Sequence, residues 1–347
     1  MKCFLSVQKT EKRCCYGCIR SYGRNWNMNR RKYRKQVMTV VLLLCMLVLS
    51  GCGKKEKTTL SIAQQFGIAY APLNIMEELG MLEEKLPDME IEWVRFGGPT
   101  GIREAMLNGE VDFGFMGVGP VLVGISNGME WKYATGISAN EVAIVTDKEN
   151  IHSLADFSEQ DCIAILSPGC TQHILLCMLA KEQLGDAMAL DHQLVSMSHP
   201  DAMNALIADT EISAHIATPP YLQEELKHGM HIVADGEDIV GGQFTFISGV
   251  AMTKFQEEYP ELYNVFIETL NEAIDYINNN PDEAIEILAP LYGISEAELK
   301  EQMGYGGTIY TNALENVAPI KKAMYEMGYI SEDFPVEDII FDNVEWK

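Results

Sequence analysis

Basic side chains are scarce in this sequence. It has 26 Lys and Arg residues against 50 Asp and Glu residues, a formal net charge of −24 at pH 7 over 347 residues. Eleven of the basic residues but only one acidic residue precede Cys52, so the rest of the chain carries 15 basic and 49 acidic side chains. Such a surface repels the phosphates of nucleic acids. We therefore expect no nucleic-acid partner.

Cysteine is also rare beyond Cys52, where only Cys162, Cys170 and Cys177 remain. Cys170 and Cys177 lie two turns apart on one predicted helix, too far apart for a disulfide. We expect all three to be small buried or half-buried side chains. No metal-ligand spacing links the histidines of this region, so no metal and no cofactor are expected; the histidines considered are His152, His192, His199, His215, His228 and His231.

One hydrophobic run, Val37 to Leu49, follows the basic segment MNRRKYRK at residues 28–35. The run is too short for a comfortable membrane span, and it has the length of a secretory signal. The residues Leu49-Ser50-Gly51 before Cys52 resemble a bacterial lipobox. We therefore expect a lipoprotein signal peptide at 28–51, a diacylated Cys52, a tether at 52–59, and a protein on the extracytoplasmic face of the bacterial cell membrane. The alternative is an uncleaved signal anchor.

The first 27 residues fit neither the signal nor the region downstream. They contain Cys14, Cys15 and Cys18, a CCxxC pattern that invites a zinc interpretation. A signal sequence normally starts at its basic region, however, and Met28 stands at the start of this one. We expect residues 1–27 to be an artefactual extension.

Phe96 to Pro120 is the most informative stretch of the remaining chain. Alternation over 91–94 predicts a strand, Gly97-Gly98-Pro99 a turn, and Thr100 the N-cap of a short helix. Residues 111–115 predict a second strand, and Gly117-Val118-Gly119-Pro120 opens the next helix. Such turns aim backbone N–H groups and helix dipoles at one place, which suits an anion or a polar ligand. An ordinary βαβ connection that binds nothing is the other interpretation.

Strands alternate with helices through residue 253, which indicates an α/β fold with mostly parallel sheets. The pattern restarts near residue 150, with Thr171 as the N-cap of a longer helix, and the chain from 254 onward is predicted to be helical. We expect two lobes, with 60–147 and 251–347 forming the first and an inserted 148–250 the second. Crossings near 147–151 and 248–252 would form the hinge.

Five phrases, in order, resemble the taurine/nitrate/sulfonate-binding (NMT1/THI5-like) family of ABC-importer substrate-binding lipoproteins. They are Tyr70-Ala71-Pro72-Leu73, FGGPTGIREAMLNGEVDFGFMG, Ser153-Leu154-Ala155-Asp156, SPGCTQHILL and INNNPDEAIEIL. The resemblance spans about residues 58–330. It implies a periplasmic-binding-protein type II fold, in which two α/β lobes with mixed, mostly parallel sheets are joined by a two-segment hinge. It also implies a non-enzymatic, monomeric protein that captures a small solute for a permease and its ATPase.

Ligands of open α/β sheets sit beyond the carboxyl ends of the strands, which gives a set of candidate binding residues. The helix N-termini at Thr100 and Thr171 would hold a sulfonate or another oxyanion without charged partners. Glu141 would balance a ligand amine, or else be a solvated loop carboxylate. Tyr70, Tyr221 and Phe244 would stack on the ligand or pack in the core, and we favour the core for Phe244. The predicted ligand-binding residues are Gln65, Tyr70, Gly98, Thr100, Gly117, Val118, Asn140, Glu141, Cys170, Thr171, Gln172 and Tyr221.

Other functions remain open at this point. Cys170 and His173 are close enough in sequence to form a thiolate nucleophile, but no third orienting group stands near them, and we predict no enzyme. A thiamin-pyrimidine synthase family shares the fold, although its Cys-rich motif is absent here. The ligand itself is undecided between taurine, an alkanesulfonate, nitrate, and a thiamin-pyrimidine precursor or related heterocycle. A tethered sensor is the remaining alternative.

Overall fold

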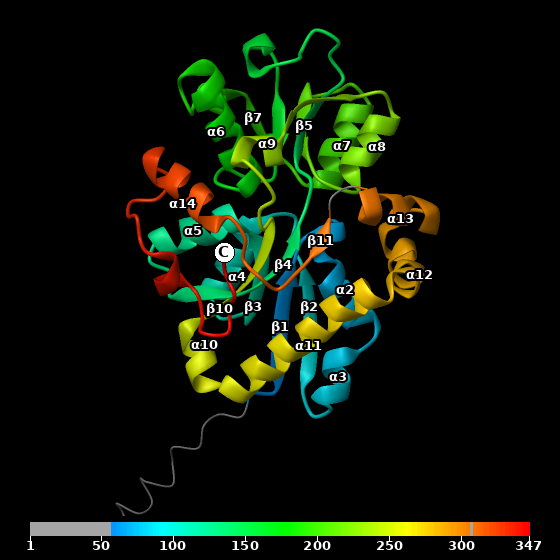
Figure 1. Cartoon of the computed structure of the whole chain (residues 1–347), viewed down its shortest axis with the longest axis vertical. Coiled ribbons are helices and arrows are strands. Elements are labelled where there is room, and N and C mark those ends of the chain that lie inside the picture. Colours follow the sequence, from blue (N-terminus) through cyan, green and yellow to red (C-terminus); the bar gives the residue numbers. More distant parts are fainter. Residues whose placement is uncertain (1–56, 306–307) are drawn as a thin grey trace, which may run out of the picture. The chain divides into compact units, whose positions relative to one another are not determined.

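The computed structural model of this protein describes residues 57–305 and 308–347. The expectations for the N-terminal extension, the signal peptide and Cys52 lie outside these residues. Residues 58–347 group as one unit, which contains two mixed sheets with helices packed against them (Figure 1). We call each sheet with its helices a lobe.

The first lobe is built on a six-stranded sheet in the order β11-β4-β10-β3-β1-β2. β1 lies between two parallel neighbours, β2 and β3, whereas β10 is antiparallel to both β3 and β4. Strands predicted at 60–63, 91–94 and 111–115 correspond to β1, β2 and β3. The two-residue β11 was not predicted. The strands are β1 (Thr59–Gln64), β2 (Glu90–Arg95), β3 (Phe113–Gly117), β4 (Trp131–Ala139), β10 (Ile247–Met252) and β11 (Ile309–Tyr310).

The second lobe contains a five-stranded sheet in the order β7-β6-β8-β5-β9. β6 is parallel to β7 and β8, and β5 is antiparallel to β8 and β9. β9 is half-buried and was not predicted, although it contains the apolar run Ile232-Val233-Ala234. The strands are β5 (Ala143–Thr146), β6 (Ile163–Ile165), β7 (Leu194–Ser196), β8 (Ala214–Ala217) and β9 (His231–Asp235).

Helices cover both sheets. The second lobe has α6 (Thr171–Leu184), α7 (His199–Ile207), α8 (Tyr221–Lys227) and α9 (Gly236–Val240). The remaining helices are α2 (Ala71–Glu78), α3 (Met81–Lys85), α4 (Pro99–Leu107), α5 (Val118–Ser126), α10 (Thr253–Glu258), α11 (Pro260–Asn279), α12 (Pro281–Tyr292), α13 (Glu296–Tyr305) and α14 (Val317–Glu326). Among the described residues, no helix combines the length and the apolar character needed to cross a membrane.

The helical tail returns to the first lobe and completes its core. On α11, Phe266 stacks on Phe113 of β3 with ring centroids 3.8 Å apart, and Tyr263 lies beside the same ring. Stacked, buried aromatic rings contribute both area burial and quadrupole interactions. The amide of Phe341 near the C-terminus donates to the carbonyl of Tyr133 on β4 at 3.0 Å. These contacts join α11 and the segment at Phe341 to strands of the first lobe.

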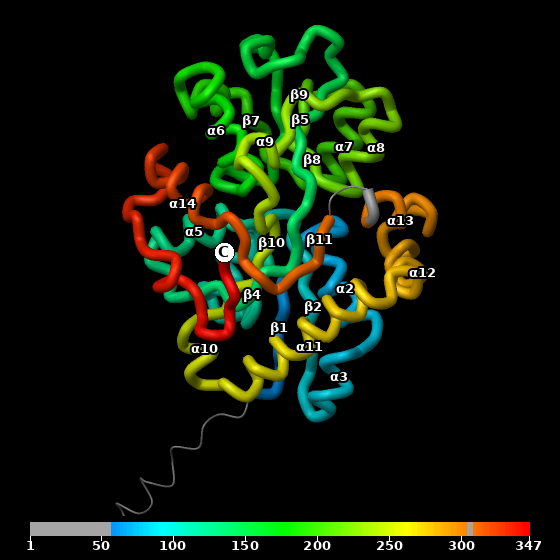
Figure 2. Tube along the Cα trace, viewed as in Figure 1, coloured from blue at the N-terminus to red at the C-terminus, as the bar shows by residue number. Residues whose placement is uncertain are grey.

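The chain changes sheets at 140–142 and at 241–246, not at the predicted 147–151 and 248–252. β5 was assigned to the first lobe, but it pairs with β8 and β9 of the second. The two crossing segments lie close to each other (Figure 2), since Phe246 N in the second donates at 2.9 Å to the carbonyl of Ser138, which stands in β4 just before the first. The strands next to the crossings, β10 and β5, are antiparallel to their neighbours. Parallel strand pairs therefore do not predominate, contrary to the prediction. An apolar strand pattern does not specify which sheet the strand joins.

Candidate functional site

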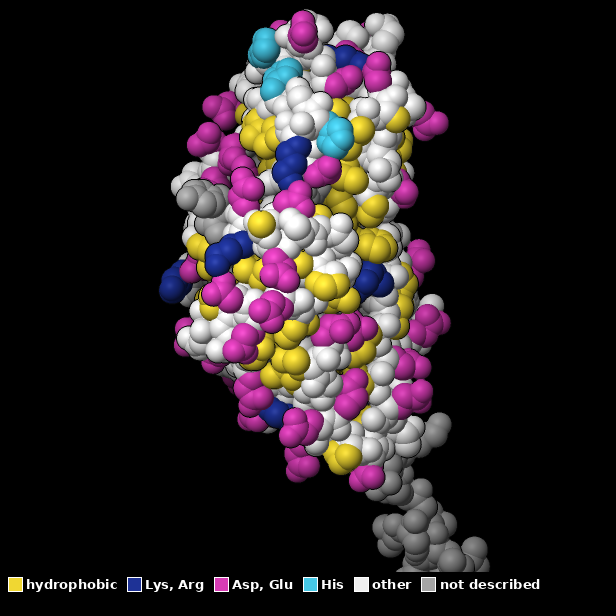
Figure 3. Space-filling view, turned by 90° about the vertical axis from the view of Figure 1, so that its right-hand side faces the viewer, with side chains coloured by type: hydrophobic (Ala, Val, Ile, Leu, Met, Phe, Trp, Pro, Cys, Tyr) yellow, Lys and Arg dark blue, Asp and Glu magenta, His cyan; other side chains and the backbone are white. Residues whose placement is uncertain are grey.

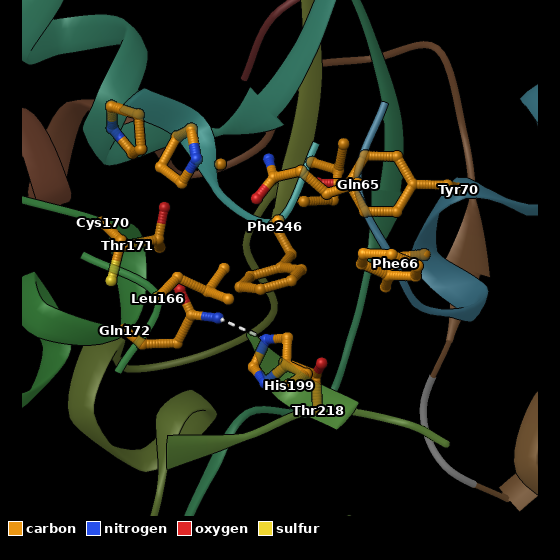
Figure 4. Close-up of a pocket in the computed structure, with 16 residues that line it drawn as sticks. Gln65, Phe66, Tyr70, Leu166, Cys170, Thr171, Gln172, His199, Thr218 and Phe246 are labelled. Atoms are coloured by element: carbon orange, nitrogen blue, oxygen red, sulfur yellow. Dashed lines mark hydrogen bonds between the residues drawn. The ribbon is translucent and has the colours of Figure 1, made fainter. Parts of the chain in front are cut away.

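A pocket of about 450 Å³, part of it open to solvent, lies where loops of both lobes meet. Gln65 and Phe66 reach it from the end of β1, and Phe246 reaches it from the second crossing segment (Figure 4). Leu166 and Gln172 contribute from the second lobe. The pocket therefore uses the carboxyl ends of β1 and β6, where ligands of α/β sheets are expected.

Two helix N-termini face one another at this pocket. α5 begins after Gly117 in the first lobe, and α6 begins after Cys170 in the second. The backbone N–H of Gly119 donates to Thr171 Oγ1 at 3.1 Å, which joins the two helix starts. A Cβ on Gly117 would lie 2.2 Å from the same Oγ1, so glycine is needed for this approach. Both helix starts bring partial positive charge to the pocket wall.

The predicted helix caps are wrong by one or two residues. Gly98 is the N-cap of α4, because Pro99 takes the first helical position that proline favours. Thr100 is exposed, within 3.5 Å of Arg103, and does not line the pocket. Cys170 caps α6, its thiol accepting from the amide of His173 at 3.4 Å. Thr171 instead directs its hydroxyl to the other lobe.

Half of the predicted ligand-binding residues line the pocket. They are Gln65, Tyr70, Gly117, Cys170, Thr171 and Gln172. Their contact with a ligand remains a prediction. Phe244, which we favoured for the core, is 1% exposed and packs there.

The other predicted residues lie around the pocket without lining it. Val118 is buried, and its carbonyl accepts from the hydroxyl of Tyr133 at 3.1 Å. Asn140 Nδ2 donates to Thr308 Oγ1 at 3.1 Å, which joins the first crossing segment to the residue before β11. Tyr221 stacks on the ring of His199, with centroids 5.6 Å apart. Gly98 lies between two lining residues.

Glu141 does not line the pocket either. Its Oε2 accepts from Gln223 Nε2 at 3.4 Å. Burial raises the pKa of this carboxyl, and the neighbouring Asp235 and Glu237 carboxylates raise it further. The predicted counter-charge for a ligand amine is therefore not in a position to contact the pocket in this structure.

The pocket lining is uncharged, because none of the 16 residues in Figure 4 is Lys, Arg, Asp or Glu. Gln65 Nε2 donates to Phe115 O at 3.4 Å, and Gln65 Oε1 is buried without a hydrogen-bond partner in the described part of the chain. Thr171, Gln172 and Thr218 are further polar groups of the wall. A ligand would thus meet neutral donors and acceptors together with the two helix dipoles.

Aromatic side chains form much of the remaining wall: Phe66, Tyr70 and Phe246 line it, with Leu166 opposite. We did not single out Phe66, Phe246, Leu166 or His199 from the sequence. Phe66 directly follows the predicted Gln65 after β1, so its place after a strand was the available signal. His199 gave none, because the residues that it contacts come from other segments of the chain.

Cys170 and His173 do not form a nucleophile–base pair. The imidazole Nδ1 of His173 accepts from Gly169 N at 2.9 Å, and its Nε2 lies 3.2 Å from Asp191 Oδ1. The ring therefore faces away from the Cys170 thiol. Burial raises the pKa of that thiol, which opposes a thiolate.

His173, Cys177 and Asp191 place three potential metal ligands within 4.8 Å of one another. Because Nδ1 of His173 accepts the N–H of Gly169, its Nε2 carries the proton in the neutral ring and is not free to bind a metal. Burial raises the pKa of Cys177 to about 12. The hydroxyl of Tyr329 lies 3.3 Å from Cys177 Sγ and 3.2 Å from His173 Nε2, so this cluster is a hydrogen-bonded junction between α6 and the C-terminal tail.

The outer surface is strongly acidic. Figure 3 shows Asp and Glu side chains spread over one face with few Lys or Arg residues among them. An ion pair on this surface joins the two lobes: Lys227 Nζ of α8 lies 2.9 Å from Glu298 Oε1 of α13. The hydrogen bond from Lys227 is the main cause that lowers the pKa of Glu298 to about 2. The charge of the surface contrasts with the neutral pocket.

The comparisons with known proteins agree with this architecture. The model of the NMT1-like family matches residues 53–291. A putative aliphatic sulfonates-binding protein of Bacillus subtilis is 23% identical over 298 residues, covering 82% of this chain and 83% of the relative. A protein of the same description from Escherichia coli is 25% identical over 219 residues, covering 62% and 66%.

Solved structures show the same fold. The alkanesulfonate-binding protein of Xanthomonas axonopodis pv. citri, bound to MOPS, superposes with a TM-score of 0.68 at 20% identity, over 82% of this chain and 99% of that one. The periplasmic nitrate-binding protein of Synechocystis has a TM-score of 0.69 at 12% identity, over 84% and 86%. The two-lobed arrangement is thus the periplasmic-binding-protein fold.

Proposed function

Because the chain belongs to the NMT1-like family, we propose that it is the extracytoplasmic solute-binding component of an ABC importer. In this role it captures a small solute between its lobes and delivers it to a permease. The relatives named above are described as binding proteins, and the Cys170–His173 geometry supports capture without catalysis.

The pocket shared by both lobes carries this proposal. Its wall takes Gln65 and Gly117 from the first lobe and Thr171 and Gln172 from the second. A solute in it contacts both lobes only when they are closed, so binding shifts the population toward the closed form. The adjacent crossing segments at 140–142 and 241–246 are the hinge in this mechanism. The closed, loaded form is the one that docks on the permease.

A small oxyanion with an apolar part, such as an alkanesulfonate, is the ligand class that the wall favours. The N-termini of α5 and α6 supply positive potential without a charged side chain. Phe66, Tyr70 and Phe246 supply apolar surface that nitrate cannot use. The same aromatic side chains, with the free carbonyl oxygen of Gln65, favour a planar heterocycle as the second candidate.

We further propose that a diacylated Cys52 anchors the protein to the cell membrane and that the protein acts as a monomer. The acidic surface of residues 52–347 supports this arrangement, because it keeps a tethered protein away from anionic lipid headgroups. Mass spectrometry of the membrane-extracted protein tests the anchor, since an unmodified Cys52 excludes it.

Thermal-shift screening followed by calorimetry tests the ligand class. The panel contains butanesulfonate, taurine, nitrate and a 4-aminopyrimidine, each at millimolar concentration. A ligand present at 100 times its dissociation constant stabilises the folded state by about 2.7 kcal/mol. We expect butanesulfonate to raise the melting temperature and nitrate to have a much smaller effect. Stabilisation by the pyrimidine alone would favour the second candidate.

The variant Phe66→Ala tests whether the ligand binds in the pocket. Phe66 is 39% exposed, so its truncation removes ligand contact with little loss of core packing. Tyr325→Ala is the matched control, because Tyr325 is 45% exposed on α14 and does not line the pocket. We expect at least tenfold weaker binding by Phe66→Ala alone. Equal affinity of both variants would contradict binding in this pocket.

A further inference from the structure

A chain of buried hydrogen-bonding side chains leads from the pocket wall into the second lobe. Gln172 Nε2 lies 3.1 Å from His199 Nε2, and His199 Nδ1 lies 2.8 Å from His215 Nε2. His215 Nδ1 lies 2.6 Å from Glu225 Oε1. All four residues are at most 4% exposed. We call His199, His215 and Glu225 the relay, and Gln172 is the pocket residue at its end.

Each hydrogen bond of the relay holds one hydrogen between its two heavy atoms. The position of one hydrogen therefore fixes the positions of the others. With Glu225 ionised, His215 Nδ1–H donates to the carboxylate and His199 Nδ1–H donates to His215 Nε2. His199 Nε2 is then an acceptor, and Gln172 must present its NH₂ group to it. The carbonyl oxygen of Gln172 is left for the pocket.

One additional proton reverses this order. When Glu225 Oε1 carries the proton, it donates to His215 Nδ1, and His215 Nε2–H then donates to His199 Nδ1. His199 Nε2 now carries a hydrogen. The same result follows if the proton resides on either imidazole ring, because each remaining contact still has one hydrogen. Gln172 must then turn its carbonyl oxygen to His199, opposite to the amide orientation in this structure, and its NH₂ group faces the pocket.

Glu225 Oε2 is the one other place for the proton, and it has no hydrogen-bond partner among the described residues. A hydroxyl there would be a buried, unsatisfied donor, which is unfavourable. A proton shared along the relay has an acceptor at every step. The relay positions are therefore favoured over Oε2.

The side chains packed on the relay are uncharged, but the Arg95 guanidinium acts on Tyr221, which stacks on His199. The neighbours of the relay are Tyr221 of α8, and Val145 of β5 and Ala164 of β6, which flank His215 in the sheet. Of these, only Tyr221 titrates, and burial raises its pKa to about 12. Glu224 and Lys227 on α8 are partly exposed and lie within 3.8 Å of each other. Titration between pH 6 and 9 thus belongs to the relay itself.

We propose that the proton content of the relay decides whether Gln172 offers donors or an acceptor to the pocket, so that capture of an oxyanion requires the protonated relay and takes up a proton wherever the free relay has lost it. The proposal deepens the proposed function, on which its ligand part depends. An acceptor-only solute such as a sulfonate binds the protonated relay, in which Gln172 supplies N–H groups. His199, His215 and Glu225 are positioning residues, because they act on the ligand through Gln172.

Burial gives the direction of the pH dependence. It raises the pKa of Glu225 to about 8, and it lowers the pKa of His215 to about 3 and that of His199 well below its usual range. The neutral, protonated relay is thus the form present near pH 7. It loses its proton as the pH rises through about 8.

Histidine tautomers, measured by long-range ¹H–¹⁵N NMR on the ligand-free protein, test the relay without any ligand. We expect His199 to change from the Nε2–H to the Nδ1–H tautomer between pH 6.5 and 9.5. Glu225→Gln should remove this change, since the amide does not titrate. Glu224→Gln, the same substitution at a partly exposed position of α8, should retain it. One His199 tautomer throughout the range would overturn the proposal.

Calorimetry with butanesulfonate tests the coupling, because its charge is constant over this range. We expect its dissociation constant to rise about tenfold per pH unit above pH 8, with uptake of up to one proton in buffers of different ionisation enthalpy. The constant should be independent of pH in Glu225→Gln and follow the wild type in Glu224→Gln. Binding without proton uptake, or with equal pH dependence in both variants, would overturn the coupling. Absence of binding at every pH, with the tautomer change present, would refute the ligand class and leave the relay standing.

Discussion

Thr171 in the second lobe accepts a hydrogen bond from the backbone N–H of Gly119 in the first, at 3.1 Å. This bond joins the starts of α5 and α6 at the pocket wall. The approach depends on Gly117, since any side chain there would meet the Thr171 hydroxyl. In the proposed mechanism, this bond forms only when the lobes are closed, together with the pocket wall.

Gly117→Ala should hinder closure. The added Cβ would lie 2.2 Å from Thr171 Oγ1 and 3.1 Å from its Cβ, and such overpacking typically costs about 1–3 kcal/mol. We expect roughly 10- to 100-fold weaker ligand binding and a larger radius of gyration by small-angle X-ray scattering. Thr171→Ala in the same chain should recover part of the loss, giving a positive coupling in a double-mutant cycle. Strict additivity of the two changes would show that the clash does not form.

Tyr329→Phe should loosen the junction between the tail and α6. The lost hydroxyl lies 3.2–3.3 Å from His173 Nε2 and Cys177 Sγ, while Ser331 N donates to Ser126 on α5 and anchors the tail there. We expect a loss of about 1 kcal/mol in urea unfolding, as for one hydrogen bond. Tyr325→Phe on α14, where the ring is largely exposed, is the control and should change nothing. Equal stability of both variants would remove Tyr329 from the junction.

Considering the relay alone, we expect the free energy of unfolding to be highest near pH 6.5. Glu225, with a pKa raised to about 8, holds a proton when folded but loses it when unfolded above about pH 4.5, so its contribution to stability falls with rising pH. The buried histidines act oppositely below 6.5, where they take up protons only on unfolding.

From pH 6.5 to 8 we therefore expect a net decrease of about 1 kcal/mol in the free energy of unfolding, because the loss from Glu225 is partly offset by the two histidines, which are still half-protonated in the unfolded chain at pH 6.5. Urea unfolding at both values should show this decrease in the wild type and in Glu224→Gln, but not in Glu225→Gln. The same slope in all three proteins would place the titration elsewhere.

Glu141→Gln should leave ligand affinity within about threefold of the wild type, because Glu141 contacts Gln223 and does not line the pocket. If Glu141 instead contacted the ligand amine away from water, its replacement would weaken the binding free energy by about 1–3 kcal/mol. Isothermal titration calorimetry with taurine, which carries an amine, decides between these outcomes. A tenfold or larger loss specific to taurine would restore Glu141 as the counter-charge.

Much of the fold was predictable because it depends on local pattern. Alternation and glycine-rich turns identified β1, β2, β3 and the starts of the neighbouring helices to within a few residues. The cap of α4 was misplaced because Thr100 and Pro99 compete for adjacent positions, and proline's fixed φ favours the first helical turn. β5 was placed in the wrong lobe because a short apolar run fits either sheet.

The sequence predicted the pocket residues that stand near strand ends. It did not predict the contacts that depend on tertiary packing. Gln65 and Gly117 stand directly at such ends, and Thr171 opens the helix that follows β6, so their sequence positions placed them at the pocket. Tyr221 was expected at the ligand but stacks on His199, and Glu141 was expected there but meets Gln223. Neither outcome could be read from spacing, because both partners are distant in sequence.

The sequence by itself determined the two-lobed α/β class, the acidic surface and the loops that would form a binding pocket, because periodicity, charge and turn chemistry are local properties. The tertiary structure decided which strands share a sheet, that Thr171 reaches Gly119, and that His199, His215 and Glu225 form one hydrogen-bonded chain. These relationships join segments separated by up to tens of residues. Only the packed chain brings such side chains within 3 Å or so of one another, where directional hydrogen bonds form.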